Sequence, residues 1–251
     1  MKSLHRADID ADSGNGEGGA LPAGGIAIVI GSSGGIGSAL HERLSTQSRF
    51  SAVLGLGRTS SPPLDLTDEA SIAGAARHVA GFGADVRLII DASGILHGDG
   101  LSPEKSWRDL DATQMTRAFA VNAIGPALLM KHFLPLLPRQ GRSVFATLSA
   151  RVGSIGDNRL GGWYSYRASK AALNQFVRTA AIELGRRQPA ALCVALHPGT
   201  VATSLSSPFV KAGLDVQTPT QAAGRLLEVI DRLPPGSSGG FFDHRGDPVP
   251  W

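Results

Sequence analysis

The sequence contains a single cysteine, so a disulfide bond within the chain is excluded. That residue, Cys193, lies in an apolar run at positions 191–195, and we interpret it as a small buried hydrophobic side chain rather than a nucleophile. The seven histidines show no metal-ligand spacing with one another or with Cys193, so the sequence predicts no metal site.

Long hydrophobic runs are also missing. No stretch of about 18 apolar residues occurs, so the sequence predicts no membrane span. The formal net charge is only +3, and acidic and basic residues are mixed along the chain without a basic block. Nucleic-acid binding is therefore not expected.

The N-terminal segment lacks the apolar core of a secretory signal and carries Asp8, Asp10, Asp12 and Glu17, which also argues against a transit peptide. Because Gly, Ala, Asp and Ser dominate it, we predict a flexible tail over residues 1–24 and a folded domain over residues 25–251. A cytoplasmic location is the default expectation.

Short apolar runs alternate with longer segments of helical periodicity through the rest of the chain. Strands are predicted at residues 26–30, 52–56, 86–91, 143–148 and 192–196, with 240–242 closing the sheet. Helices are predicted at residues 35–46, 70–80, 113–137, 166–187 and 220–233, with a bend at Pro126. This alternation predicts a single α/β domain with a doubly wound parallel sheet and helices on both faces.

A glycine-rich segment, Gly31-Ser32-Ser33-Gly34-Gly35-Ile36-Gly37, joins the first predicted strand to the first predicted helix. Glycines at such a junction allow a tight turn and let the backbone approach a pyrophosphate, which the helix N-terminus attracts. The plainer interpretation is an ordinary turn in a chain that contains 32 glycines. Its position directly after a strand favours a nucleotide-binding loop.

A Tyr-Lys pair starts the longest helical pattern after the fourth strand. Tyr166 and Lys170 are four residues apart and so share one helix face. A nearby ammonium would lower the tyrosine pKa and prepare Tyr166 for proton exchange with a hydroxyl or carbonyl oxygen. A surface tyrosine beside a solvated lysine is the alternative for this pair taken alone.

Taken together, the motifs resemble the short-chain dehydrogenase/reductase family, from about Gly25 to the C-terminus. The resemblance implies a Rossmann fold and a catalytic set of Asn122, Ser149, Tyr166 and Lys170. It also implies cofactor contacts from Gly31, Ser33, Gly35, Ile36, Gly37, Asp65, Leu66, Ala92, Gly94, Asn122, Tyr166, Lys170, Pro198, Gly199, Val201 and Thr203.

A closer resemblance is to the C-factor-like and sniffer-like branch of that family, carried by residues 149–158 and 163–174. Departures from the family pattern are Ile30 in place of a threonine and Asp91-Ala92-Ser93-Gly94 in place of Asn-Asn-Ala-Gly. The interval from Ser149 to Tyr166 is also longer than the common one, so the loop that shapes the substrate pocket is distinctive.

The expected function is hydride transfer between a nicotinamide cofactor and a carbonyl or alcohol substrate, with Tyr166 as acid and base. The resemblance further implies that Ser149 hydrogen-bonds the substrate oxygen, that Lys170 binds the nicotinamide ribose, and that Asn122 holds a proton-relaying water. The alternative is a dinucleotide-binding signalling or regulatory protein with little turnover, which the C-factor-like resemblance suggests.

The cofactor preference is argued from the second predicted strand. No acidic residue follows it; Arg58 stands there instead and can pair with a 2′-phosphate, with Thr59 and Ser60 as further donors. NADP(H) is therefore expected over NAD(H), although NAD(H) remains possible. A substrate-facing loop is expected at residues 205–216, and the resemblance implies a homo-oligomer paired through the two long helices.

Overall fold

The computed structural model describes residues 21–98, 100–209, 213 and 215–251. Six parallel strands form one sheet in the order β2-β1-β3-β4-β5-β8. Their bounds are β1 Ile26–Ile30, β2 Ala52–Leu56, β3 Val86–Asp91, β4 Ser143–Leu148, β5 Ala191–His197 and β8 Phe241–Asp243. The predicted strands are thus confirmed, including the C-terminal one that closes the sheet.

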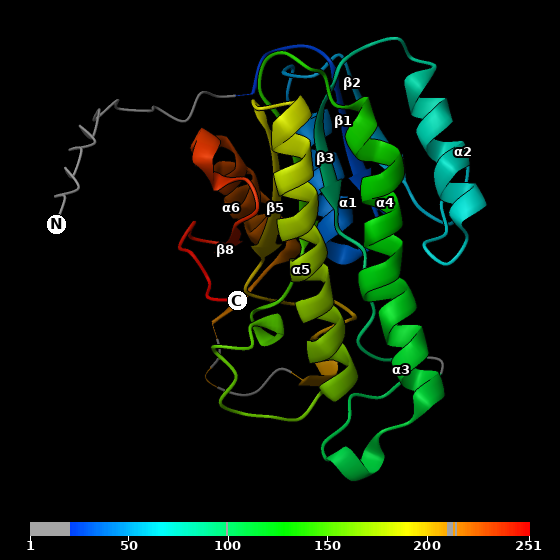
Figure 1. Ribbon diagram of the computed structural model, residues 1–251, viewed down its shortest axis with the longest axis vertical. Helices are drawn as coiled ribbons and strands as arrows, with labels where there is room; N and C mark the ends of the chain where they lie inside the picture. The colour runs from blue at the N-terminus through cyan, green and yellow to red at the C-terminus, as the bar shows by residue number, and fades with distance from the viewer. Residues whose placement is uncertain (1–20, 99, 210–212, 214) are drawn as a thin grey trace, which may run out of the picture.

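Helices cover both faces of this sheet, as Figure 1 shows. One face carries α1 (Gly35–Ser45) and α6 (Pro219–Arg232), whose apolar side chains form one core cluster. The other face carries α2 (Glu69–Ala80), α4 (Gly125–Phe133) and α5 (Tyr164–Arg187), which form the second cluster. The predicted doubly wound α/β fold is confirmed.

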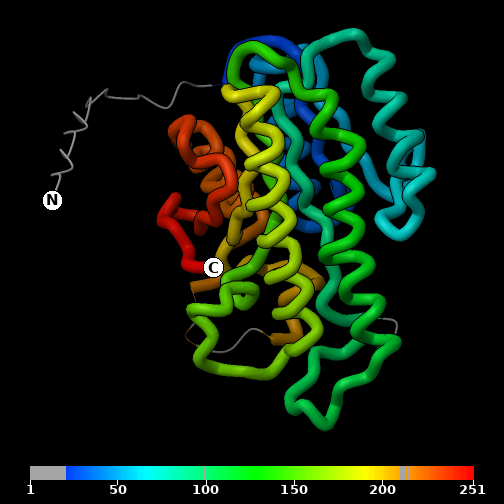
Figure 2. The backbone as a smooth tube through the Cα atoms, viewed as in Figure 1, coloured from blue at the N-terminus to red at the C-terminus, as the bar shows by residue number. Residues whose placement is uncertain are grey.

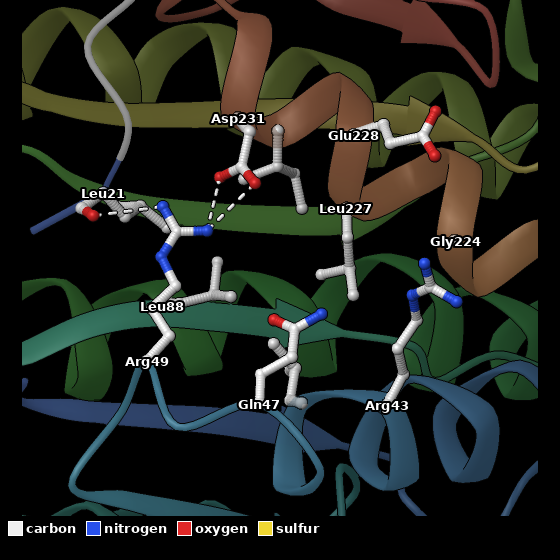
Figure 3. A pocket seen from close by; sticks show the side chains of 11 residues that line it. Leu21, Arg43, Gln47, Arg49, Leu88, Gly224, Leu227, Glu228 and Asp231 are labelled. Atoms are coloured by element: carbon white, nitrogen blue, oxygen red, sulfur yellow. Dashed lines mark hydrogen bonds and ion pairs between the residues drawn. The ribbon is translucent and has the colours of Figure 1, made fainter. Parts of the chain in front are cut away.

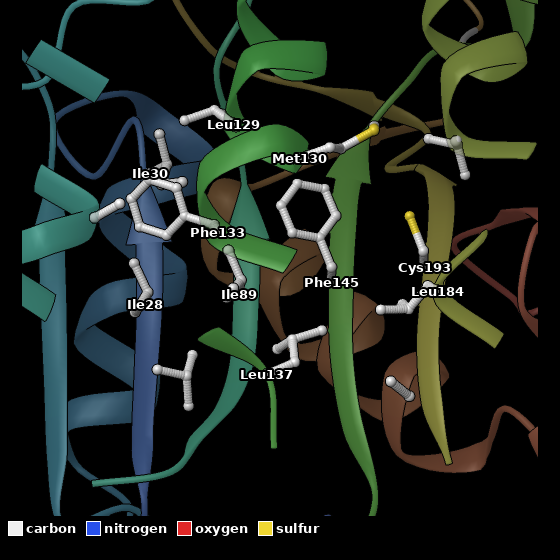
Figure 4. Close-up of a cluster of buried hydrophobic side chains, with 14 of the residues drawn as sticks. Ile28, Ile30, Ile89, Leu129, Met130, Phe133, Leu137, Phe145, Leu184 and Cys193 are labelled. Atoms are coloured by element: carbon white, nitrogen blue, oxygen red, sulfur yellow. The ribbon is translucent and has the colours of Figure 1, made fainter. Parts of the chain in front are cut away.

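The strands are apolar along their whole length because both of their faces are buried. All five residues of β1 are buried, and Ile28 and Ile30 point to the face that α4 covers (Figure 4). Phe133 of α4 and Phe145 of β4 lie in the same cluster and are fully buried. Such a core fixes the sheet as a rigid platform for the loops at its ends.

The predicted helix over residues 113–137 is irregular at Pro126. The structure divides it into α3 (Ala112–Phe119), a π-helical turn η2 (Ala120–Ile124), α4 and a 3-10 turn η3 (Leu134–Leu136). The Gly125 N–H bonds to the Ala120 carbonyl, five residues back. Pro126 has no N–H to offer the carbonyl four residues before it, so the irregularity expected as a bend takes the form of a π-helical turn.

An 18-residue window of this helical stretch, Ala112–Leu136, has a mean hydropathy of 1.3, and the stretch is long and apolar enough to span a membrane by those two measures alone. It packs between α2 and α5 against the sheet, where a core helix has the same composition. No membrane span is inferred from it.

Residues 21–24 of the predicted N-terminal tail lie against the domain in the structure. Leu21 is only 4% exposed and belongs to the core cluster under α1 and α6. Arg49 donates to the Leu21 carbonyl at 3.0 Å and accepts a bond from the Gly24 N–H at 2.7 Å. The remainder of the predicted tail, residues 1–20, lies outside the described residues.

Candidate active site

The site residues gather beyond the carboxyl ends of the strands. Gly31 follows β1, Ala92 follows β3, Ser149 follows β4 and Pro198 follows β5. The chain moves outward from β1 to β2 and then returns to the other side of β1 with β3, so two loops diverge at this point of the sheet. Figure 2 shows the segments after β4 and β5 at the same end of the molecule as the start of α5. Open α/β sheets bind ligands at such a switch point.

The glycine loop turns sharply out of β1. Gly31 has a φ of +76°, and its N–H bonds to the Leu56 carbonyl at 2.8 Å. Gly34 precedes the first residue of α1 and makes no side-chain cap, and the first turn contains no acidic residue. The N–H groups of this turn are therefore available to an anion, and Ser33 is exposed beside them.

Two glycines keep this loop thin enough for a dinucleotide to lie against it. A Cβ on Gly37 would lie 2.1 Å from the Gly31 carbonyl oxygen. A Cβ on Gly35 would lie 2.8 Å from Cγ2 of Thr203, so the loop touches a segment far along the chain. These close approaches fit the residues expected to hold a pyrophosphate and the nicotinamide end.

The stretch that begins at Pro198 is held by a small sheet that the sequence analysis did not predict. It pairs β6 (Thr200–Val201) with β7 (Val216–Gln217). Gln217 donates from Nε2 to the Pro198 carbonyl at 3.0 Å, and Gly199 between them has a φ of +79°. Pro198, Gly199, Val201 and Thr203 thus line one wall of the site.

On the adenine side, Arg58 is exposed in the loop after β2. Asp65 accepts bonds from the N–H and hydroxyl of Thr67 at 2.8 and 2.7 Å, which hold the pKa of its carboxyl below the usual value. Leu66 packs on Gly125, where an added Cβ would lie 2.7 Å from the Leu66 Cβ. The Ser60 hydroxyl donates to the backbone of its own turn, and its expected role as a phosphate donor stays a prediction.

Asn122 lies in the π-helical turn and is fully buried. Its side chain accepts from the Ile95 N–H and donates to the Ile95 carbonyl, each at 2.8 Å. A Cβ on Gly94 would lie 3.3 Å from Asn122 Oδ1 and 3.5 Å from Lys170 Nζ. The structure therefore shows Asn122 clamping the loop after β3 beside Lys170, while its expected role in proton relay stays a prediction.

The first turn of α5 carries Tyr166. Glu104, which is buried, accepts bonds from the Ser165 hydroxyl and from the Ser165 N–H, the latter at 3.1 Å. This carboxylate satisfies a donor at the start of α5 and fixes the helix end. Lys170, one turn further on, donates to the Leu148 carbonyl at 2.8 Å. Lys170 thus points toward the end of β4, and Tyr166 lines a cavity together with Ser149.

Burial controls the two titratable groups. It raises the pKa of Tyr166 to about 12. It lowers the pKa of Lys170 to about 8, against the opposing effect of the negative charge on Asp91. The tyrosine pKa is therefore raised and not lowered as expected, because burial disfavours the charged phenolate.

Ser149 is buried and donates its hydroxyl proton to Asn174 Oδ1 at 2.6 Å. Asn174 is on α5, one turn after Lys170, and its Nδ2 has no hydrogen-bond partner among the described residues. Asn174 ends the stretch 163–174 that carries the closer family resemblance, but no role was predicted for it. The spacing Tyr166, Lys170, Asn174 was the available signal, since it marks one face of the helix.

Ser149 and Tyr166 line one cavity of about 540 Å³. Its aromatic wall is formed by Trp163 against Phe209, with ring centroids 5.1 Å apart, and by Trp163 against Tyr166 at 6.2 Å. Trp163 has a φ of +53°, which is rare for a bulky residue and turns the chain into α5. The predicted substrate loop contributes Phe209 to this wall, while its Val210 and Leu214 lie outside the described residues.

Several lining residues carried no signal that the sequence analysis used. His197, at the end of β5, lines the cavity, and burial lowers its pKa to about 4, so it is neutral at physiological pH. Arg159, in the long interval before α5, and Arg167, near the start of α5, also line the cavity. The length of the interval from Ser149 to Tyr166 indicates a distinctive loop, but it does not say where the side chains of that loop lie.

Cys193 and metal binding play no part in this geometry. Cys193 is fully buried in β5, and burial raises the pKa of its thiol to about 12, as suits a structural residue. In residues 21–98, 100–209, 213 and 215–251, no group of three or more His, Cys, Asp or Glu side chains could hold a metal ion.

A second, smaller cavity of about 80 Å³ lies between α1 and α6 (Figure 3). Arg49 on its wall forms an ion pair with Asp231 at 2.8 Å and donates a hydrogen bond to the Leu21 carbonyl. Leu21 and Arg49 precede β1 and β2, so this cavity is at the amino ends of the strands. None of the predicted site residues lies there.

Comparisons with known proteins agree with this fold. A family model described as enoyl-(acyl carrier protein) reductase matches residues 37–231. The C-signal protein of Myxococcus xanthus is 40% identical over 144 residues, which are 57% of this chain and 82% of that protein. A 1-hydroxy-2-glutathionyl-2-methyl-3-butene dehydrogenase of Rhodococcus sp. is 33% identical over 195 residues, 78% of this chain and 81% of that one.

Among solved structures, an NADPH-bound carbonyl reductase from chicken fatty liver superposes with a TM-score of 0.80 at 27% identity, covering 92% of this chain and 96% of that one. The matched region contains the glycine loop's helix, the Tyr-Lys pair and most of the sheet. The chain therefore belongs to the short-chain dehydrogenase/reductase family of oxidoreductase enzymes.

Proposed function

We propose that this enzyme transfers a hydride between NADP(H) and a carbonyl or alcohol substrate bound in the cavity beside Tyr166. The observation that carries the proposal is that Ser149 and Tyr166 line one cavity, while Lys170 bonds to the carbonyl of Leu148 and the glycine loop lies at the same end of the strands. The carbonyl reductase and the dehydrogenase among the similar proteins support this reaction class.

The chain's own residues provide positioning and a proton. A bound nicotinamide supplies or accepts the hydride. In the reducing direction Tyr166, neutral with a pKa of about 12, donates its phenolic proton to the oxygen that becomes the alcohol. Ser149 orients that oxygen, and the ammonium of Lys170 stabilises the tyrosinate that forms. The Trp163 and Phe209 rings exclude water from the reacting carbon.

NADP(H) is the preferred form in this proposal. Arg58 is exposed at the end of β2, where a ribose 2′-phosphate would lie, and no carboxylate directly follows that strand. A guanidinium there can form a charge-assisted bond with the phosphate. The NADPH named for the similar carbonyl reductase supports the same choice.

The direct test is NADPH oxidation with aldehydes, ketones and quinones, measured on the wild type and on Tyr166→Phe. The substitution removes only the hydroxyl, so kcat should fall by at least about 100-fold while the Kd of NADPH changes little. Near-normal turnover by Tyr166→Phe would overturn the assignment of the acid and base.

Signalling with little turnover is the second candidate, favoured by the 40% identity to the C-signal protein. Under this reading the enzyme binds NADPH tightly but oxidises it with no member of the substrate panel. The cavity that Ser149 and Tyr166 both line supports turnover instead.

We also propose that the chain forms a homo-oligomer through α4 and α5. Ile124, Phe176 and Ile182 are large apolar residues at the end of η2 and on α5 that are 41–51% exposed. Light scattering on the wild type and on Ile182→Glu tests this, and a monomeric wild type would contradict it.

A further inference from the structure

The cavity beside Tyr166 carries more positive than negative charge. Three arginines and one aspartate line it, namely Arg151, Arg159, Arg167 and Asp157. Asp157 is ion-paired with Arg151 at 2.8 Å. Arg159 and Arg167 have no carboxylate partner within the described part of the chain. Since the whole chain has a net charge of only +3, this local surplus is large.

Arg167 is the more buried of the two cations. Its Nε donates to the carbonyls of Gly161 and Gly162 at 3.2 and 2.9 Å, and its Nη1 donates to the Val152 carbonyl at 3.2 Å. Its Nη2 makes no hydrogen bond with any described residue. Burial lowers the pKa of Arg167, so its guanidinium is partly desolvated and has only neutral acceptors. A cation in that state is stabilised by an incoming oxyanion.

Arg159 and Leu160 form the outer rim of the same cavity. Arg159 donates to the Gly156 carbonyl at 3.0 Å and is otherwise exposed. Leu160 beside it is 92% exposed although it lines the cavity. An apolar side chain left in water beside a cation suits a ligand that is itself part apolar and part anionic.

We infer that the natural substrate is an apolar carbonyl or alcohol compound that carries an oxyanion, a carboxylate or a phosphate, recognised by Arg159 and Arg167. The inference rests on the proposed hydride transfer. The reacting oxygen lies at Ser149 and Tyr166, the apolar body lies against the aromatic wall, and the oxyanion reaches the two guanidinium groups.

Three aldehydes built on one ring test this inference. Methyl 4-formylbenzoate is neutral, 4-carboxybenzaldehyde carries a carboxylate and 4-formylphenyl phosphate carries a phosphate. With NADPH as the reductant, we expect kcat/KM for at least one anionic aldehyde to exceed that of the neutral ester by about 10-fold. The larger of the two gains identifies which oxyanion the site prefers.

Substitution of the arginines should reduce that selectivity. Arg159→Gln changes an exposed residue and should lower the anionic-to-neutral ratio by about 5-fold or more, chiefly through KM. Arg167→Lys keeps the charge but loses the planar donor fork, and it should lower the ratio by a smaller factor. Arg139→Gln is the control. Arg139 is exposed and precedes β4, so it lies at the amino ends of the strands, away from the cavity, and its substitution should leave the ratio unchanged.

Equal kcat/KM for the neutral and both anionic aldehydes, or an unchanged ratio in Arg159→Gln, would overturn the inference and leave hydride transfer intact. No NADPH oxidation with any aldehyde would instead contradict the proposed function. In that case calorimetric titration with 4-carboxybenzaldehyde decides the inference. Equal affinity of the wild type and Arg159→Gln would overturn it.

Discussion

At the scale of single residues, burial sets the proton affinities of Tyr166 and Lys170 in opposite directions. The pKa of Tyr166 is about 12, so the tyrosine keeps its proton at physiological pH. The pKa of Lys170 is about 8, so half of the lysine has lost its proton at about pH 8. A neutral tyrosine is the form that can donate to a carbonyl, so the free enzyme is prepared for reduction at physiological pH. The ammonium that supports this donation is the group whose charge is sensitive to pH.

We therefore predict that kcat/KM for carbonyl reduction is level below about pH 8 and falls above it, because Lys170 loses its charge there while Tyr166 stays protonated. Lys170→Arg should give a slower enzyme without this decline, since the guanidinium remains charged. Initial rates across a pH series check the prediction, and a level profile well above pH 8 would contradict it.

The same depressed pKa of Lys170 implies that the free energy of unfolding rises between about pH 8 and 10.5. In that pH range the unfolded chain holds the lysine proton and the folded chain has lost it.

The bond from Ser149 to Asn174 determines what Ser149 can offer a substrate. While the hydroxyl proton is donated to Asn174 Oδ1, the Ser149 oxygen can only accept. Rotation of the Asn174 amide would place the free Nδ2 against Ser149 and release that proton for a carbonyl oxygen. Asn174 is thus a positioning residue that acts through Ser149.

A double-mutant cycle tests this role of Asn174. Asn174→Leu should lower kcat by about 10-fold when Ser149 is present, because the serine loses its partner, and by less than about 2-fold in a Ser149→Ala background. Asn174→Asp, which keeps an acceptor but has no donor, should not recover the loss. Equal factors in both backgrounds would show that Asn174 affects only packing.

Arg58 is predicted to determine cofactor choice. The Kd of NADPH should be well below that of NADH in the wild type, and Arg58→Ala should reduce this ratio by about 10-fold or more through loss of the phosphate contact. Arg58→Lys should retain part of the preference. Equal affinity for the two cofactors in the wild type, or an unchanged ratio in Arg58→Ala, would refute the role.

At the scale of elements, two helical glycines occupy opposite environments. Gly37 in α1 faces the Gly31 carbonyl, which an added Cβ would approach to 2.1 Å. Gly74 in α2 would place a Cβ no closer than 3.9 Å to its nearest neighbour, the Arg77 side chain. Helix propensity favours alanine at both positions, so only the contact distinguishes them.

We predict that Gly74→Ala stabilises the protein by about 0.5–1 kcal/mol. Gly37→Ala should lower the Tm and abolish cofactor binding, because the glycine loop must move to make room for the methyl group. Thermal melts with and without NADPH measure both effects. A Gly37→Ala protein with wild-type cofactor affinity would contradict the close approach seen at the loop.

Element types followed from the sequence, whereas element details did not. Apolar β-branched runs such as Ile26–Ile30 can only be strands buried on both faces, and the structure confirms them. The small β6–β7 sheet could not be predicted, because two-residue strands have no periodicity and exist only through pairing. The π-helical turn similarly arose from Pro126 together with the packing of Asn122 on Ile95.

At the scale of the whole molecule, Leu21 packs into the core ahead of the first strand. Truncation of residues 1–20 should leave the Tm unchanged, since that segment has few apolar groups to bury. Truncation of residues 1–24 should lower the Tm by several degrees, because burial of a leucine contributes about 1.5–3 kcal/mol. Melting curves of the two truncated proteins check this, and identical values would show that Leu21 contributes nothing.

The sequence by itself determined the doubly wound fold, the glycine loop and the Tyr166-Lys170 pair, because periodicity and spacing are local properties that the chain carries before it folds. Only the tertiary structure decided the proton affinities of that pair, the bond from Ser149 to Asn174 and the gathering of Arg159 and Arg167 around one cavity. These depend on which groups are desolvated and which distant segments meet, and neither is set by the spacing of residues along the chain.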